Sequence, residues 1–227
     1  MDKKRLGYSG IMFGAFILFT LMVRFIDRKD IGPLGSKVGF AWMNQTVKNI
    51  IGQNNVWYGL SSFFGLLVIL IVILFVCMGG YELLRRRSLK KVDADIYAMA
   101  LIYVIMFGFY ILFEKVIINY RPILDNGELE ASFPSSHTFM AVTVMGCAAI
   151  AFGKRIVDRN TRIVTVAGCF LIMLFAILTR FLSGAHWFTD ILAGMLLGAT
   201  LIMLYGAIYD LAFELMRNVK DREEDTY

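Results

Sequence analysis

The chain contains only two histidines, and one of them has a carboxylate at helical spacing. His186 precedes Asp190 by four residues, so the imidazole and the carboxylate would share one face of a helix. A carboxylate on one ring nitrogen fixes the tautomer and makes the other nitrogen a better nucleophile or base. The pair therefore predicts nucleophilic or acid–base chemistry. The alternative is a buried hydrogen-bonded pair that only fixes helix packing.

Cationic and hydroxyl side chains near both histidines would suit an anionic substrate. Arg180 lies six residues before His186, and Arg121 precedes the run Pro134-Ser135-Ser136-His137. Arginine offers forked donors that match phosphate oxygens, and Lys115 adds a compact positive charge. The two serines of the run would leave backbone N–H groups available to an anion at a helix start. One arginine alone could instead reach toward lipid headgroups.

Membrane-spanning helices are the elements that must position these residues. Apolar residues (AVILMFWYC) form 58% of the 227 positions and charged residues only 18%, which excludes a disordered chain and argues against a soluble fold. Uninterrupted apolarity does not alternate as a strand does, and an open sheet cannot cross lipid. A helix needs about 20 apolar residues to cross a bilayer. Six runs qualify or nearly do: Leu6–Val23, Leu60–Tyr81, Ile96–Phe113, Pro134–Gly153, Ile163–Thr179 and Ile191–Tyr209.

The positive charges predict how these six spans are oriented. Fifteen lysines and arginines fall on the side of both termini and eight on the other side. Because positive loops stay in the cytoplasm, we expect both termini, with the tail 218–227, to be cytoplasmic. The histidines, Arg121, Arg180, Lys115 and Asp190 then lie at the extracytoplasmic ends of their spans. No small-x-small cleavage site follows the first run, which favours a retained span over a signal peptide.

The segment 30–58 between the first two spans is long for a simple loop. Phe40, Met43, Val47 and Ile50 recur in it at helical spacing. This pattern favours a helix lying in the headgroup layer, although an ordinary solvated connector is the alternative. We expect residues 1–227 to form a single all-α domain, an integral membrane protein with six transmembrane helices.

Other features narrow the function by exclusion. The formal charge of +5 comes from short clusters between apolar runs, so it does not indicate a nucleic-acid partner. Cys77, Cys147 and Cys169 lie inside apolar runs without CxxC spacing, which argues against a disulfide framework or a zinc site. No carboxylate cluster suits a metal, so we expect no cofactor. Gly194 and Gly198 form a GxxxG pattern that predicts close helix packing.

The chemically active positions resemble a known family, the type 2 phosphatidic acid phosphatases, integral membrane relatives of the vanadium haloperoxidases. Their signature has three parts: Lys, six residues and Arg-Pro; then Pro-Ser-Gly-His; then Ser-Arg, five residues, His, three residues and Asp. The third part is matched in spacing by Thr179-Arg180, His186 and Asp190, with Thr179 in the serine position.

The other two parts depart further from the signature. The second reads Pro134-Ser135-Ser136-His137, with Ser136 in place of glycine. In the first, Arg121-Pro122 matches, but Glu114 stands at the lysine position and Lys115 follows it. The three parts occupy about 75 residues, and the six-span layout extends the likeness along the whole chain.

The resemblance implies a metal-independent enzyme that hydrolyses a lipid phosphate in the bilayer. By this likeness His186 attacks phosphorus, Asp190 holds His186, and His137 protonates the departing oxygen. Arg121, Arg180, Ser135, Ser136 and Lys115 are the expected phosphate-binding residues. The substrates left open are phosphatidate, phosphatidylglycerophosphate and undecaprenyl diphosphate.

Two other functions remain open on the same scaffold. One is a lipid phosphotransferase, in which an acceptor hydroxyl replaces water. The other is a lipid-phosphate binder or transporter without catalysis, which would need the arginines but not the His186–Asp190 pair. Short loops and Lys/Arg-rich inner loops are typical of a bacterial plasma-membrane protein. An outward site would suit recycling of an isoprenoid carrier.

Overall fold

The computed structural model describes residues 3–124 and 127–224, and it folds them into a bundle of long helices. The described residues contain no β-sheet, and six helices are long and apolar enough to cross a membrane. The all-α class and the six predicted spans are therefore confirmed. In chain order the elements are α1 Lys3–Phe25, η1 Pro33–Gly35, α2 Ala41–Ile51, α3 Asn55–Arg86, η2 Leu89–Lys91, α4 Ala94–Lys115, α5 Ser136–Arg155, α6 Arg159–Leu182 and α7 Phe188–Glu224.

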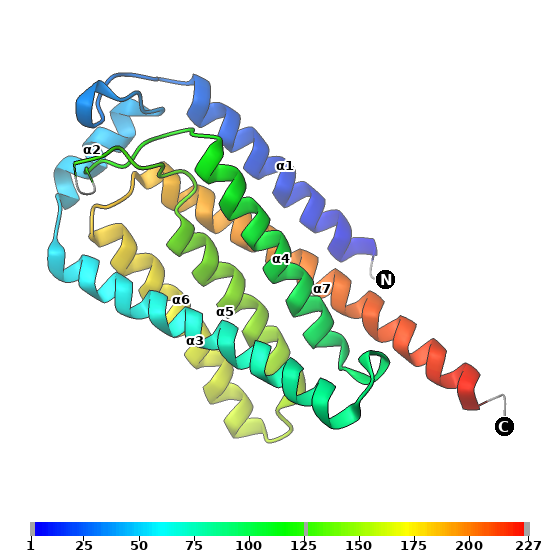
Figure 1. The fold of residues 1–227 in the computed structure, drawn as a ribbon. Helices are drawn as coiled ribbons and strands as arrows, with labels where there is room; N and C mark the ends of the chain where they lie inside the picture. Colours follow the sequence, from blue (N-terminus) through cyan, green and yellow to red (C-terminus); the bar gives the residue numbers. More distant parts are fainter. Residues whose placement is uncertain (1–2, 125–126, 225–227) are drawn as a thin grey trace.

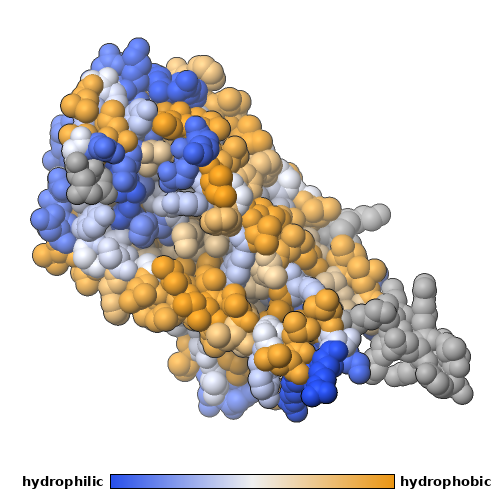
Figure 2. All heavy atoms as spheres, in the orientation of Figure 1, coloured by the Kyte–Doolittle hydropathy of each residue, from blue (hydrophilic) through white to orange (hydrophobic). Residues whose placement is uncertain are grey.

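The long helices run side by side, and the two ends of the bundle differ (Figure 1). Both termini lie at one end, whereas α2 and the loops around it cover the other. Hydrophilic residues gather at the two ends and a hydrophobic band lies between them, as Figure 2 shows. This distribution matches a bilayer with water on both sides.

Helix α5 forms the centre of the bundle. In its most apolar 18-residue stretch 67% of the residues are buried, whereas the buried share of the corresponding stretch is 11% in α6 and 17% in α1 and α3. A Cβ atom on Gly198 of α7 would lie 2.6 Å from the Cβ of Val142, and one on Gly194 would lie 2.9 Å from the Ser135 carbonyl oxygen. The GxxxG pattern thus packs α7 closely against α5, as predicted. This contact brings the start of α5 against the start of α7.

Several helices extend beyond their apolar runs. Helix α3 begins at Asn55, five residues before the predicted span, because the Asn54 side chain accepts hydrogen bonds from the backbone N–H groups of Val56 and Trp57. Helix α7 continues to Glu224, so most of the predicted tail 218–227 is helical backbone. Residues 225–227 of that tail lie outside the described residues. Apolarity marks where a span crosses lipid, but capping and continued hydrogen bonding set where the helix ends.

The helix expected between the first two spans is α2. Its buried face is formed by Ala41 and Asn44, whereas Ile50 from the predicted apolar stripe is 79% exposed. The Asn44 side-chain amide donates to the Gly39 carbonyl (2.8 Å) and to Thr189 Oγ1 (3.0 Å), and its oxygen accepts from the Thr189 N–H (3.2 Å). The apolar spacing therefore predicted the helix, but hydrogen bonds to the start of α7 decide which face it packs.

Candidate active site

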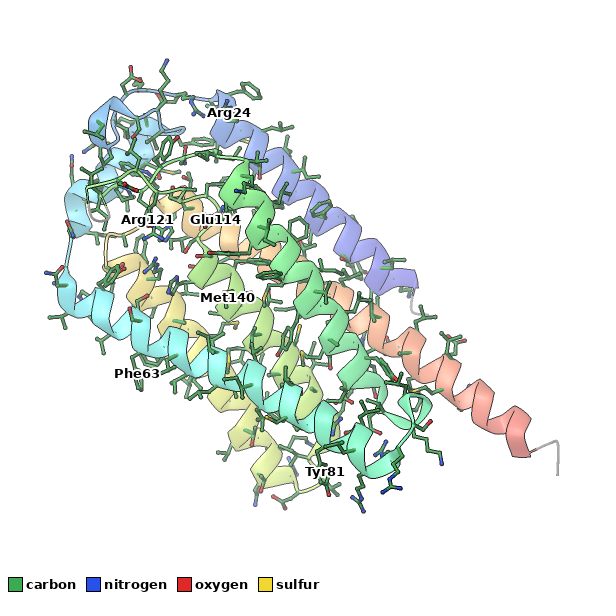
Figure 3. All side chains as sticks on the ribbon, in the orientation of Figure 1. Arg24, Phe63, Tyr81, Glu114, Arg121 and Met140 are labelled. Carbon is green, nitrogen blue, oxygen red and sulfur yellow. The ribbon has the colours of Figure 1, made fainter. Side chains whose placement is uncertain are left out.

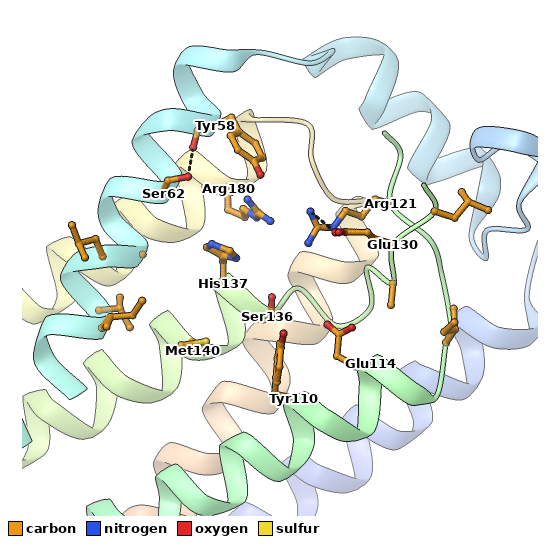
Figure 4. Close-up of a pocket in the computed structure, with 17 residues that line it drawn as sticks. Tyr58, Ser62, Tyr110, Glu114, Arg121, Glu130, Ser136, His137, Met140 and Arg180 are labelled. Carbon is orange, nitrogen blue, oxygen red and sulfur yellow. Dashed lines mark hydrogen bonds and ion pairs between the residues drawn. The ribbon is translucent and has the colours of Figure 1, made fainter. Parts of the chain in front are cut away.

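A cavity of about 840 Å³ lies at the α2 end of the bundle (Figure 4). Its apolar wall comes from α3, α4 and α5 and includes Leu66, Ile69, Tyr110 and Met140. Figure 3 places Arg121 and Glu114 at this end of the molecule and Tyr81 at the opposite end of α3. The polar lining includes Arg121, Arg180, His137, Ser136, Glu114 and Glu130. Charged groups from parts of the chain far apart in sequence thus converge on one space.

His186 lies in the turn between α6 and α7, with its side chain 2% exposed. Its Nδ1 atom is 3.0 Å from the Ser132 carbonyl oxygen, and its Nε2 atom is 2.9 Å from Arg180 Nη2. A carbonyl can only accept and a guanidinium can only donate, so Nδ1 carries the proton and Nε2 presents a lone pair. Nε2 is therefore the ring nitrogen whose lone pair could act as a nucleophile.

Asp190 lies close to His186 but is held by other donors. Its Oδ2 atom is 3.7 Å from His186 Nδ1, which is longer than a hydrogen bond. Oδ2 accepts instead from the Trp187 N–H (3.1 Å), and Oδ1 accepts from Asn119 Nδ2 (3.2 Å). The expected face-sharing is present, but the Ser132 carbonyl is the group that holds the Nδ1 proton. Asp190 caps the start of α7 and lies beside the imidazole.

The surroundings of His186 favour its neutral form. Burial lowers the pKa of this imidazole well below its usual 6.5, and the nearby positive charges of Arg180 and Arg121, together with His137, lower it further. A neutral imidazole is what nucleophilic attack requires at neutral pH.

Arg180 and Arg121 approach the cavity from different elements. Arg180, in the last turn of α6, is 1% exposed, and its guanidinium lies 5.5 Å from the Tyr58 ring centroid. Within the described part of the chain, its Nε and Nη1 atoms have no hydrogen-bond partner. Arg121 Nη1 is 3.1 Å from Glu130 Oε2. Buried guanidinium donors without acceptors indicate a place where anion oxygens bind.

His137 and Ser136 begin α5 and face the cavity, whereas Ser135 does not. His137 points toward Arg180 in Figure 4, and a Cβ atom on Gly65 of α3 would lie 3.3 Å from its ring. Ser135 is fully buried: its N–H donates to the Asp190 carbonyl (3.0 Å) and its Oγ accepts from Thr138 Oγ1 (3.1 Å). Ser136 therefore lines the cavity, whereas Ser135 links the start of α5 to α7 through its backbone hydrogen bond.

Lys115 is not brought to the arginines. It is the exposed last residue of α4 and does not line the cavity, whereas its neighbour Glu114 does. One residue is about 100° around a helix, which is enough to exchange the residue that faces inward.

A second, small cavity of about 30 Å³ adjoins the large one. It is bordered by His186 and shares Arg121, Ser136 and Glu114 with the large cavity that His137 lines. Its volume is about that of one water molecule. The two imidazoles therefore line adjoining cavities, and Arg121 lines both of them. In the described residues, no group of three or more His, Cys, Asp or Glu side chains could hold a metal ion.

Several residues that shape the site were not predicted from sequence. Asn119 and Ser132, described above, are two of them. In addition, Glu130 forms an ion pair with Arg121, and Lys48 of α2 donates to the Pro122 carbonyl (2.9 Å). Lys48 Nζ also lies 5.0 Å from the Trp187 ring centroid. Asn119 is only two residues before Arg121, which could have drawn attention to it. A backbone carbonyl such as that of Ser132 leaves no sequence signal.

Six membrane-length helices with paired histidines and arginines at one end define a multi-pass membrane protein that acts on an anionic group. The chain belongs to the PAP2 superfamily, whose model matches residues 9–213. Its fold is similar to the crystal structure of a transmembrane PAP2-type phosphatidylglycerolphosphate phosphatase from Bacillus subtilis, with a TM-score of 0.61 and 18% identity over 94% of this chain and 96% of that one. None of the curated proteins compared with the chain matches it. Family membership supports a phosphatase activity.

Proposed function

We propose that the protein is a membrane lipid phosphatase that hydrolyses a phosphate ester through a phosphohistidine at His186. The observation that carries this proposal is that His186 and the His137 ring line adjoining cavities, with Arg121 in the lining of both and Arg180 Nη2 2.9 Å from His186 Nε2. Acid, nucleophile and anion-binding groups are the parts that phosphoryl transfer requires.

The first step transfers the phosphoryl group to the enzyme. The phosphate oxygens bind Arg180, which turns its donor away from His186 Nε2 and frees the lone pair. Nε2 then attacks phosphorus, the bond from phosphorus to the leaving oxygen breaks, and protonated His137 gives its proton to that oxygen. The leaving oxygen is the lipid oxygen of a monoester or the bridging oxygen of a diphosphate. Arg121 and Arg180 stabilise the negative charge that develops on the transferred group.

The second step releases phosphate. Neutral His137 takes a proton from a water molecule, the water oxygen attacks phosphorus, and the phosphorus–nitrogen bond to His186 breaks. His137 is then protonated and His186 neutral again, so the cycle closes. The two guanidinium groups supply the positive charge for both steps, and we therefore expect no metal requirement.

The apolar wall of the cavity supports a lipid substrate. Leu66, Ile69 and Met140 would contact the hydrocarbon chain while the headgroup lies among the arginines. The candidate substrates are phosphatidate, phosphatidylglycerophosphate and undecaprenyl diphosphate. The loop charges support a site on the extracytoplasmic face of a bacterial plasma membrane, with both termini inside.

Phosphate release by detergent-purified protein tests the proposal. The assay is run in EDTA over these three lipids, with His186→Ala as the inactive variant. We expect release from at least one lipid in the wild type and a loss of at least 10³-fold in the variant, as for other removed nucleophiles. Release that survives His186→Ala, or that needs added metal, would contradict the proposed mechanism.

A further inference from the structure

Glu114 occupies the cavity at the position where the family signature has a lysine. Its side chain leaves the last turn of α4 and lines both the large cavity and the small one that borders His186. Figure 4 shows its carboxylate directed into the cavity on the side of Ser136 and Arg121. A carboxylate there acts opposite to a lysine, because it repels phosphate oxygens and accepts hydrogen bonds.

Glu130 adds a second negative charge to the same lining. Its carboxylate is paired with Arg121 at 3.1 Å, so part of that arginine's charge is already balanced. The charges of the two glutamates cancel those of Arg121 and Arg180. With a lysine in place of Glu114, the same four positions would carry two net positive charges. The cavity can therefore compensate one phosphate group through Arg180 more readily than two.

Arg180 independently marks where that phosphate group binds. It is 1% exposed, lines the cavity, and has two guanidinium nitrogens without a hydrogen-bond partner among the described residues. Because Arg180 comes from α6 and Glu114 from α4, the two side chains enter the cavity from different walls. A phosphate on Arg180 thus shares a confined space with the Glu114 carboxylate.

We propose that Glu114 is a specificity-determining residue. It accepts a hydrogen bond from a hydroxyl or ammonium group a few bonds from the substrate phosphate, and it disfavours a second phosphate group. The selected substrates are lipid phosphate monoesters that carry such a donor, and diphosphates are poor substrates. This inference rests on the proposed function, because it names the substrates of the same site.

Two matched substrate pairs test the inference through kcat/KM. Farnesyl phosphate and farnesyl diphosphate differ by one phosphate group, and lysophosphatidate has a free hydroxyl near the phosphate where phosphatidate carries a second acyl chain. We expect the wild type to prefer the first member of each pair. Glu114→Gln removes the charge and should raise the diphosphate-to-monophosphate ratio about tenfold, and Glu114→Lys should raise it further, since removing a like charge removes repulsion.

The hydroxyl preference is tested with Glu114→Leu, which removes the acceptor. We expect the lysophosphatidate-to-phosphatidate ratio to fall about fivefold, the effect of one lost hydrogen bond of about 1 kcal/mol. A long-chain amino-alcohol phosphate in the same assay separates recognition of ammonium from that of hydroxyl. The control is Glu128→Gln, because Glu128 is exposed in the same loop as Glu130 but does not line the cavity. It should leave both ratios unchanged.

A binding measurement separates this inference from the proposed function. In the His186→Ala background, inorganic phosphate and inorganic diphosphate are compared by the rise in melting temperature that each produces. We expect Glu114→Gln to strengthen the diphosphate effect selectively. If no lipid is hydrolysed but this selectivity appears, the proposed function fails, and only the role of Glu114 in selecting the anion that the cavity binds stands. If hydrolysis proceeds but Glu114 variants change neither the substrate ratios nor the diphosphate effect, the inference is overturned.

Discussion

The Nδ1 atom of His186 lies 3.0 Å from the Ser132 carbonyl, and the nearest Asp190 oxygen is 3.7 Å away. A backbone oxygen therefore orients the His186 imidazole, and the Asp190 carboxylate accepts from the Trp187 N–H in the turn that carries it. This arrangement leaves Nε2 as the reactive atom, with Arg180 as its partner before substrate binds.

The positions of Arg121 and Lys115 predict unequal roles. Arg121 lines both cavities, whereas Lys115 lines neither the large nor the small one. We expect Arg121→Ala to lower kcat/KM by about 10²-fold or more, as removal of a transition-state donor does, and Lys115→Ala to change it less than threefold. Steady-state phosphate release measures both. Equal losses in the two variants would show that Lys115 reaches the phosphate after all.

The lowered pKa of His186 predicts a stability change with pH. Below its usual pKa of 6.5 the imidazole takes up a proton in the unfolded chain but stays neutral in the folded one, so protons favour unfolding as pH falls. The melting temperature of the wild type should therefore drop between pH 7 and pH 5. In His186→Gln the drop should be smaller. An identical drop in both proteins would show that His186 titrates normally in the fold.

Sequence alone identified the residue types of the site better than their contacts. His186, His137, Arg121 and Arg180 were found because charged groups are rare near long apolar runs and because their spacing fits a known signature. The inward direction of Glu114 instead of Lys115 depends on where α4 ends, and the role of Ser132 depends on a carbonyl 54 residues from its partner. Neither is encoded in local spacing.

Among the elements, α2 packs against the start of α7 and the turn that carries His186. Asn44 binds Thr189 at the start of α7, and Lys48 links the Pro122 carbonyl to the Trp187 ring. The helix itself followed from apolar spacing, but its docked face could not be predicted because a buried asparagine decides it. An amide with three partners in a protein interior fixes orientation more strongly than a partly exposed apolar stripe.

Loss of Asn44 tests this role. Asn44→Ala leaves the Thr189 N–H and the Gly39 carbonyl without their partner, so we expect the free energy of unfolding to fall by about 1–3 kcal/mol and kcat to fall as the His186 turn loosens. Thermal unfolding in detergent and phosphate release measure the two effects. Gln45→Ala is the control, because Gln45 lies one position along α2 and its side-chain amide donates to exposed Asn49 of the same helix. Asn44→Ala that behaves like Gln45→Ala would show that α2 does not brace the site.

In the whole molecule, the two ends of the bundle differ in what their charged residues do. The α2 end holds the cavity, and the opposite end is closed by an ion-pair network around Arg155 of α5. Arg155 Nη2 lies 3.0 Å from Glu82 of α3, 2.8 Å from Asp95 of α4 and 3.4 Å from Asp93. The six spans were predictable because lipid requires continuous apolarity, whereas this network joins charges from three separate segments.

Removal of Arg155 should therefore affect stability more than chemistry. Arg155→Ala removes the ion-pair partner of buried Asp95 and leaves Glu82 with the more distant Arg86 at 3.9 Å. We expect a loss of about 2–3 kcal/mol of unfolding free energy, below the roughly 3–5 kcal/mol of a fully buried pair because Arg155 is 24% exposed. Thermal unfolding measures it, with exposed Arg159→Ala as the control at the same end. The folded fraction should keep its activity. Lost activity with unchanged stability would contradict the separation of the two ends.

The central claim is that His186 carries the phosphoryl group during turnover, and trapping the intermediate tests it most directly. Protein mixed with a radiolabelled lipid phosphate is quenched within milliseconds in alkali, where phosphohistidine survives, and the labelled peptide is identified by mass spectrometry. We expect a label on His186 that is acid-labile and absent from His186→Ala. A label on another residue, or turnover by the wild type with no labelled protein at any time, would contradict it.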